Sequence, residues 1–103
     1  MSTQLKKKLH GTDWQTGDAA EFLQLSAEES ALIDIRLSLA QAAKQSRLLH
    51  DLSQTDLAKR MKSSQSRIAK IEAADPSVSI DLMVRALLAS GAGRVDVAKA
   101  LRY

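Results

Sequence analysis

The sequence predicts an all-α protein with a single helical domain, for three reasons. Apolar residues recur every three or four positions over most of the chain, which is the spacing of one helix face, and no stretch alternates convincingly with the period of a strand. The 103 residues include only four glycines and one proline, which favours helices over a turn-rich β fold. A chain of this length fits one small domain, which we expect over residues 16–103.

The residues before this domain's main helices are expected to form a polar extension. Residues 1–15 show no sustained period and are interpreted as a flexible tail. Their run Lys6–Lys8 is either solvated or an additional contact to phosphate. Asp18 and Glu21 have the spacing of a capping box, which predicts a short helix over residues 18–25.

A long helix is predicted over residues 27–50, begun by the S-x-x-E capping box of Ser26 and Glu29. Its apolar positions fall on two neighbouring faces. The first face is expected to line the core, and the second to meet the N-terminal helix, a second subunit or a partner protein. The first face consists of Leu32, Ile35, Leu39 and Ala42. The second consists of Ile33, Leu37, Ala40 and Leu48.

Two short helices joined by a tight turn are predicted over residues 53–73. Ser53 caps the first and Ser64 the second, with the turn at Lys62 to Ser64. This is the helix-turn-helix geometry, in which the first helix supports a second that enters the major groove of DNA. The buried positions are expected at Leu57, Ala58, Met61, Ile68 and Ile71.

Two further helices, over residues 80–90 and 94–102, complete a five-helix domain. Asp75 precedes Pro76, and the residue before a proline avoids the helical conformation, so the helix before it ends there. The segment Gly91-Ala92-Gly93 is expected to be the turn between the last two helices.

Positive charge is concentrated in the helix-turn-helix region. Residues 52–73 carry five basic and two acidic residues, a net charge of +3 that equals the net charge of the whole chain. The outward face of the second short helix has no acidic residue before Glu72. Glutamine pairs with adenine, arginine and lysine favour guanine, and serine bonds a base or a phosphate. The predicted base contacts to double-stranded DNA are therefore Gln65, Ser66, Arg67 and Lys70.

The segment LSQTDLAKRMKSSQSRIAKIE resembles the helix-turn-helix of the phage-repressor-like (Xre/Cro) transcription factors. The resemblance rests on L-S-Q-x-x-L-A, Q-S-x-I and I-E, and covers about residues 32–91. With the following DPSVSIDLMVRALLASG, the chain is most similar to small antitoxins of the HigA type. The resemblance implies a phage-repressor-like fold and a repressor that binds a palindromic operator as a homodimer. It also implies an antitoxin that is paired with a HigB-like toxin and represses its own operon.

The resemblance also implies roles for individual residues. Gln65, Ser66 and Lys70 match base-contacting positions, and Ser53, Gln54 and Ser64 match positions that contact the DNA backbone. Gln54 also matches a residue that buttresses the recognition helix in relatives. Arg47 and Glu72 match a buried or half-buried ion pair that ties the long helix to the recognition helix. Without the resemblance, these two residues could equally be unrelated surface charges.

Three positions depart from the family, because Asp51, Lys62 and Ala74 stand where relatives usually have glycine. Either the turn at Lys62 takes another conformation, or Lys62 bears strain and lies beside a phosphate of the DNA backbone. Asp75 stands in a loop where relatives often have a basic residue, so fewer phosphate contacts are expected there.

Nothing in the sequence indicates an enzyme, a cofactor or a metal site. The chain has no cysteine, His10 and His50 have no partner at ligand spacing, and no base lies at triad spacing from Ser63, Ser64 or Ser66. No apolar run approaches the roughly 18–20 residues of a membrane span, so we expect a cytoplasmic protein. Two alternatives stay open, a stand-alone Xre-family regulator and a protein-binding inhibitor whose DNA binding is secondary.

Overall fold

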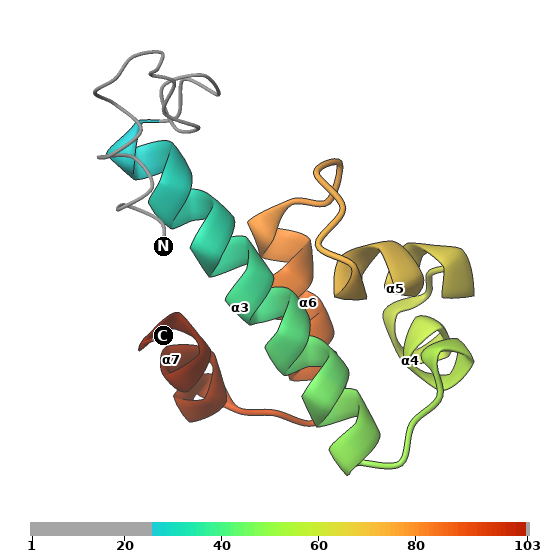
Figure 1. Ribbon diagram of the computed structural model, residues 1–103. Helices are drawn as coiled ribbons and strands as arrows, with labels where there is room; N and C mark the ends of the chain where they lie inside the picture. The colour runs from blue at the N-terminus through green and yellow to red at the C-terminus, as the bar shows by residue number, and fades with distance from the viewer. Residues whose placement is uncertain (1–25, 103) are drawn as a thin grey trace. The chain divides into compact units, whose positions relative to one another are not determined.

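A computed structural model describes residues 26–102, which form five α-helices and no strand (Figure 1). The prediction of an all-α fold is therefore confirmed. The predicted tail, the run Lys6–Lys8 and the predicted helix over residues 18–25 lie outside the described residues. The five helices are α3 (Ala27–Leu49), α4 (Gln54–Met61), α5 (Gln65–Glu72), α6 (Ile80–Ala89) and α7 (Arg94–Arg102).

A boundary between Leu32 and Ile33 divides the chain into two compact units. The described part of the first unit is the start of α3, where the predicted capping box is present. The Glu29 N–H donates to the Ser26 hydroxyl at 3.0 Å, and the Ser26 N–H donates to the Glu29 carboxylate at 2.9 Å. These two bonds satisfy backbone donors that an uncapped helix start would leave unpaired.

The second unit contains the apolar core. Within it, α4 and α5 contact each other and α6, while α7 contacts α6. Figure 1 shows α4 and α5 on one side of the C-terminal half of α3 and α7 on the other. Met61, which the sequence predicts to be buried, is only half-buried. The largest fully buried apolar side chains are Leu39, Leu57, Ile68, Ile71, Met83 and Leu87.

The face that α3 turns toward the core overlaps the predicted one, because Leu39 is in the core and Ile35 and Ala42 pack against it. Its buried residues are Leu39, Ala40, Ala43 and Arg47. From the predicted core face, only Leu39 is fully buried, whereas Leu32 is 47% exposed. Arg47 is held inside by an acidic partner on α5. The buried side of α3 therefore extends from the predicted face to Ala40, Ala43 and Arg47.

Four helices end in the same hydrogen-bonded turn, the Schellman motif. In each, one residue has a positive φ: Asp51 (56°), Lys62 (54°), Ala74 (56°) and Gly91 (114°). The N–H of the following residue donates to the carbonyl five positions earlier, over distances between 2.8 and 3.4 Å. These bonds run from Leu52 to Arg47, Ser63 to Ala58, Asp75 to Lys70 and Ala92 to Leu87.

The turns thus keep the conformation that glycine favours even where glycine is absent. Of the two alternatives for Lys62, the strained one is present, since Lys62 has φ 54° and ψ 49°. A left-handed conformation costs a residue with a Cβ atom about 1 kcal/mol more than it costs glycine. Asp51 tolerates this region better than Lys62 and Ala74, because its short polar side chain can bond locally.

None of the five helices of the described part combines the length and the apolar character that crossing a bilayer requires.

Of the four turn residues at positive φ, Gly91 is the one whose replacement we expect to lower the free energy of unfolding most. Its φ of 114° is rarely adopted by other residues, and an added Cβ would lie 2.9 Å from Nε2 of His50. The His50 ring is held in place, because its Nδ1–H donates to the carbonyl of Ser46 at 2.8 Å. Gly91→Ala should lower the free energy of unfolding by about 2 kcal/mol, as measured by chemical denaturation with circular dichroism.

The matched control is Gly93→Ala, because the nearest atom to its added Cβ is 3.9 Å away. This control should stay within about 0.5 kcal/mol of the parent protein. Equal stabilities for the two variants would contradict the assignment of strain to Gly91.

Candidate nucleic-acid interface

The helices α4 and α5 are joined by three residues, Lys62 to Ser64, and each begins at a serine cap. Ser53 forms a capping box with Asp56, in which the Asp56 N–H donates to the Ser53 hydroxyl at 3.0 Å and the Ser53 N–H donates to the Asp56 carboxylate at 2.9 Å. These bonds from Ser53 hold the pKa of Asp56 below its usual value. At α5, the Arg67 N–H donates to the Ser64 hydroxyl at 3.2 Å. Both helix starts are therefore fixed by their own sequence.

The four predicted base contacts lie on the outer side of α5. Ile68 and Ile71 are fully buried and hold the inner side of this helix against the core. All four predicted residues, Gln65, Ser66, Arg67 and Lys70, are exposed. The helix thus presents two amide or hydroxyl groups and two cations to the solvent along two turns.

The four predicted contacts to the DNA backbone lie around the same helix. Ser53, Lys62 and Ser64 are exposed, whereas Gln54 is half-buried. Gln54 begins α4, and Lys62 lies at the end of α4 in the turn that leads to α5. The structure joins the two predicted sets at two points, where Gln54 bonds Gln65 and the Ser64 hydroxyl lies 3.2 Å from the Ser66 hydroxyl.

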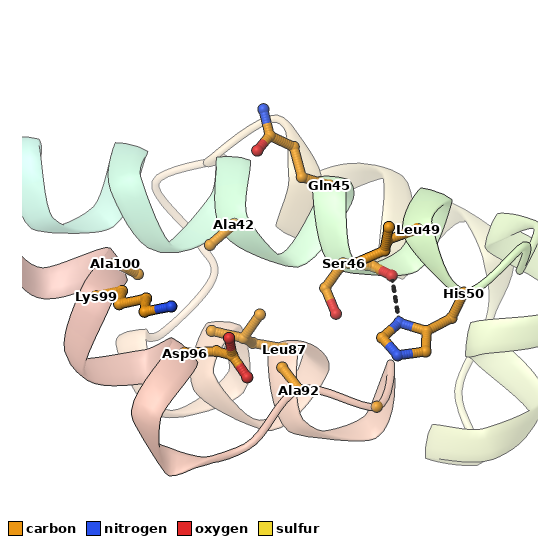
Figure 2. Close-up of a pocket in the computed structure, with 11 residues that line it drawn as sticks. Ala42, Gln45, Ser46, Leu49, His50, Leu87, Ala92, Asp96, Lys99 and Ala100 are labelled. Carbon is orange, nitrogen blue, oxygen red and sulfur yellow. Dashed lines mark hydrogen bonds between the residues drawn. The ribbon is translucent and has the colours of Figure 1, made fainter.

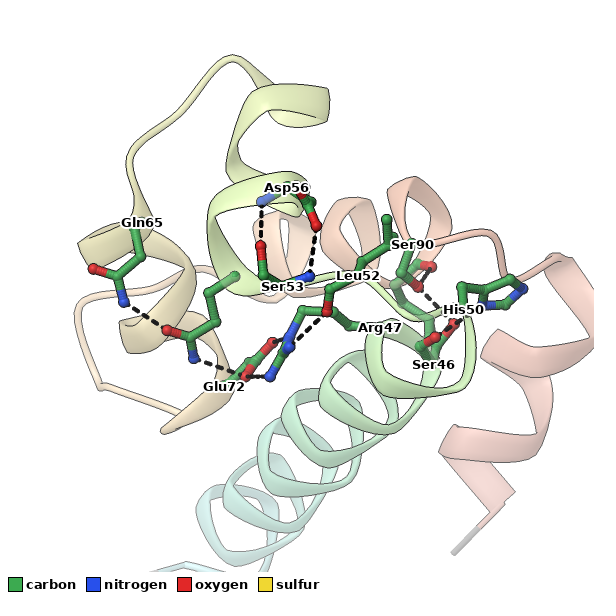
Figure 3. A network of polar contacts seen from close by, with 11 residues as sticks. Ser46, Arg47, His50, Leu52, Ser53, Asp56, Gln65, Glu72 and Ser90 are labelled. Atoms are coloured by element: carbon green, nitrogen blue, oxygen red, sulfur yellow. Dashed lines mark hydrogen bonds and ion pairs between the residues drawn. The ribbon is translucent and has the colours of Figure 1, made fainter.

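Arg47 and Glu72 form a buried, two-bond ion pair between α3 and α5 (Figure 3). The Arg47 Nε and Nη2 atoms donate to Oε2 and Oε1 of Glu72 at 2.6 and 3.0 Å. The two side chains are only 8% and 5% exposed. Hydrogen bonding to Glu72 raises the pKa of Arg47. The third bond of Arg47, from Nη1 to the carbonyl of Leu52 at 2.8 Å, holds the loop before α4.

Burial of this pair decides the charge of the α5 surface. Glu72 is the one acidic residue of α5, and its carboxylate is covered and paired with Arg47. The exposed charges of α5 are then those of Arg67 and Lys70 alone. With Lys62 in the preceding turn, three cations border this surface. Such a surface attracts a polyanion, because phosphate contacts supply much of the affinity for nucleic acids.

Gln54 contacts α5, as the resemblance implies, whereas the contact of Arg36 was not predicted from the sequence. Gln54 bonds to side chains at both ends of α5, donating from Nε2 to Glu72 Oε1 at 3.0 Å and accepting from Nε2 of Gln65 at 2.6 Å. Arg36 donates from Nη2 to the carbonyl of Asp75 at 2.8 Å and so holds the loop after α5. The residues Arg36, Ala40, Ala43 and Arg47 lie on one face of α3 at spacings of four, three and four, and this stripe was a usable signal.

The loop after α5 carries a negative charge, as the sequence predicts. The N–H and hydroxyl groups of Ser77 donate to Oδ1 of Asp75 at 2.9 and 2.7 Å, and these bonds lower the pKa of Asp75. This carboxylate therefore stays ionised at neutral pH, which disfavours phosphate at this end of the surface.

A separate groove of about 670 Å³ lies between α3, the end of α6 and α7 (Figure 2). Leu87 and small alanines line it together with His50, Asp96 and Lys99. It contains none of the predicted DNA-contacting residues. Within residues 26–102, no three histidine, aspartate or glutamate side chains gather where they could hold a metal ion.

Comparison with models of protein families matches residues 44–89 to the family described as Helix-turn-helix, which is of the Xre/Cro type. Together with the geometry of α4 and α5, this match gives the chain a helix-turn-helix domain and supports a DNA-binding regulator of transcription. The match does not extend to the HigA type. No curated protein and no solved structure was found to match the chain.

Removing only one partner of the Arg47–Glu72 pair should destabilise the protein more than removing both. Arg47→Met should lower the free energy of unfolding by about 3–5 kcal/mol, because it leaves a buried carboxylate without its cation. The double variant Arg47→Met, Glu72→Leu should recover most of that loss, because no buried charge is left. Chemical denaturation of the single and double variants measures both values.

Lys44→Met is the control, because Lys44 is exposed on the same helix. It should change the stability by less than about 0.5 kcal/mol. If Arg47→Met were equally mild, the pair would not hold α5 to α3.

Proposed function

Because residues 44–89 form a helix-turn-helix domain, we propose that the protein is a sequence-specific repressor that binds double-stranded DNA through the outer side of α5. The observation that carries this proposal is the exposed surface of α5, whose charged groups are all cationic because Glu72 is buried. In this proposal α5 lies in the major groove, where an α-helix fits and each base pair presents a distinct pattern.

The proposal gives the residues of this surface two kinds of role. The side chains along α5 read base edges, and those around its start and the preceding turn bind phosphates and set the position of the helix. The base contacts are Gln65, Ser66, Arg67 and Lys70, and the backbone contacts are Ser53, Gln54, Lys62 and Ser64.

The active form is proposed to be a homodimer on a palindromic operator. A recognition helix of eight residues reaches few base pairs, so one copy offers little specificity. Two copies related by a two-fold axis would place their α5 helices about 34 Å apart in successive major grooves.

Removing a base contact should weaken specific binding more than non-specific binding. The operator is first obtained by selecting bound duplexes from a random pool. Gln65→Ala and Arg67→Ala should each cost about 1–3 kcal/mol on the selected duplex and relax the preference at one position. Fluorescence anisotropy with selected and random duplexes measures both effects.

Arg85→Ala is the control for Arg67→Ala, because Arg85 is an exposed arginine on α6 outside the proposed surface. It should leave the ratio of specific to random binding unchanged. Equal losses on both duplexes for Gln65→Ala and Arg67→Ala would show that these residues do not read bases.

Replacing Lys62 by glycine should raise the stability of the protein and lower its affinity for DNA. Lys62→Gly relieves the left-handed strain and should raise the free energy of unfolding by about 1 kcal/mol. It also removes a proposed phosphate contact, which should weaken binding similarly on all sequences and reduce the slope of log affinity against log salt by about one. Denaturation and anisotropy at several salt concentrations measure these quantities.

Ala74→Gly is the matched control, because Ala74 has nearly the same φ as Lys62, 56° against 54°, but no charge. This variant should gain similar stability and keep the affinity and the salt slope of the parent. If Lys62→Gly also kept the affinity and the salt slope of the parent, Lys62 would not be a phosphate contact.

A second candidate function is that of an antitoxin that represses its own operon and binds a HigB-like toxin. It is favoured by leucines on α3 that a protein partner would cover, because Leu37, Leu48 and Leu49 are 53%, 54% and 79% exposed. A small basic ribonuclease encoded beside this gene, and its co-purification with the protein, would support it. Otherwise the protein is a stand-alone regulator, located with its DNA in the cytoplasm.

A further inference from the structure

The loop after α5 lies beside a cation that the predicted DNA contacts do not include, the guanidinium of Arg36 on α3. Its Nη2 donates to the carbonyl of Asp75 at 2.8 Å, and both residues belong to the second unit. Arg36 precedes residues 44–89, the segment that matches the helix-turn-helix family. The contact is therefore made by a part of α3 that the family match does not include.

Arg36 and Arg47 lie on the same face of α3 but differ in their partners. The Arg47 side chain is buried and paired with the carboxylate of Glu72. Arg36 is half-buried, and its guanidinium donates to a carbonyl, which carries no charge. A guanidinium has five N–H groups, so its bond to the carbonyl of Asp75 leaves others that can bind a further acceptor.

The carboxylate of Asp75 bonds within its own loop rather than to Arg36. Its Oδ1 accepts from the N–H and the hydroxyl of Ser77 at 2.9 and 2.7 Å. Asp75 and Arg36, both within the described residues, form no ion pair with each other. The bonds from Ser77 are the main cause of the lowered pKa of Asp75, and the nearby charges of Lys70 and Arg36 lower it further. Two cations thus lie around one carboxylate at this end of α5.

The length of α5 places this loop near the DNA backbone. Two phosphate backbones border the major groove, which is about 12 Å wide. At 1.5 Å per residue the eight residues of α5 are about 12 Å long, so the segments before and after this helix each come near a backbone. The loop follows α5 directly, because the N–H of Asp75 donates to the carbonyl of Lys70 at 3.0 Å. The phosphate contacts proposed so far all lie before the first residue of α5.

We propose that Arg36 binds a phosphate of the DNA backbone at the end of α5, where its charge offsets the repulsion by Asp75. The bond to the carbonyl of Asp75 positions the guanidinium, and its remaining N–H groups bond the phosphate, a geometry that suits arginine. This inference rests on the proposed DNA binding. It adds a phosphate site at the other end of α5, made by a residue outside the helix-turn-helix.

The first test compares the salt dependence of DNA binding for Arg36→Met and the parent. Methionine keeps an apolar stem but has no charge. Fluorescence anisotropy is measured with the selected duplex and a random duplex at several salt concentrations. Arg36→Met should weaken binding by the same factor on both duplexes and reduce the slope of log affinity against log salt by about one, because one phosphate contact is lost.

Arg36→Lys separates a phosphate contact from a merely structural role. Lysine keeps the cation without the planar fork, so it should restore the salt slope of the parent. The control is Arg85→Met, the same exchange as Arg36→Met at an exposed arginine of α6, which should keep the affinity and the slope. A loss of affinity in Arg36→Met without a change of slope would mean that Arg36 only holds the loop, and would overturn the inference.

The second test leaves Arg36 in place and neutralises its neighbour. Asp75→Asn keeps an oxygen that can accept from Ser77 but removes the charge, so binding to both duplexes should strengthen at least about twofold when a phosphate lies here. Asp96→Asn is the control, the same exchange at an exposed position of α7, and should keep the affinity. Equal affinities of Asp75→Asn and the parent would show that no phosphate lies at this end, and would overturn the inference.

Binding by the parent protein separates this inference from the proposed function. If the parent binds the duplexes and Arg36→Met keeps its salt slope, only the phosphate contact of Arg36 is rejected. A parent protein that binds neither duplex would reject the proposed function together with this contact.

Discussion

The structure depends on one buried carboxylate, that of Glu72 at the end of α5. Through Arg47 it holds α5 to α3, and the same guanidinium holds the loop at Leu52 that precedes α4. Its burial also clears α5 of exposed negative charge, and its bond to Gln54 reaches the start of α4. A buried ion pair adds little net stability, since replacing both partners by apolar groups is often neutral. Its value here lies in placing and shaping a cationic surface.

The turn at Lys62 shows the same compromise between stability and surface charge. Three Schellman turns carry a non-glycine residue at positive φ, at Asp51, Lys62 and Ala74. Lys62 is the one whose side chain brings a cation to the turn between α4 and α5. Glycine would be more stable at this position but would remove that charge. Local strain of this kind tends to persist at functional sites, where the surrounding structure holds it.

Much of this fold could be predicted because its signals are local. Capping serines lie within three residues of the N–H groups they bind, so Ser53 and Ser64 are recognisable from the sequence. The burial of Arg47 on α3 follows from a distant partner, Glu72, and only the resemblance to the family indicated it. The contact of Gln54 with α5 was implied only by the resemblance to the family. Residue types alone indicate a polar surface. They do not show which side-chain groups donate and which accept, because that depends on where the buried carboxylate of Glu72 lies.

We propose that the outer side of α5, held in place by the Arg47–Glu72 pair, is the surface that binds DNA. Titrating ¹⁵N-labelled protein with a selected duplex and following amide signals by NMR tests it most directly. We expect the largest shifts on residues 62–70 and on the side-chain amides of Gln54 and Gln65, with little change in α7. Shifts concentrated on α7 or on the groove beside His50, with α5 unaffected, would contradict it.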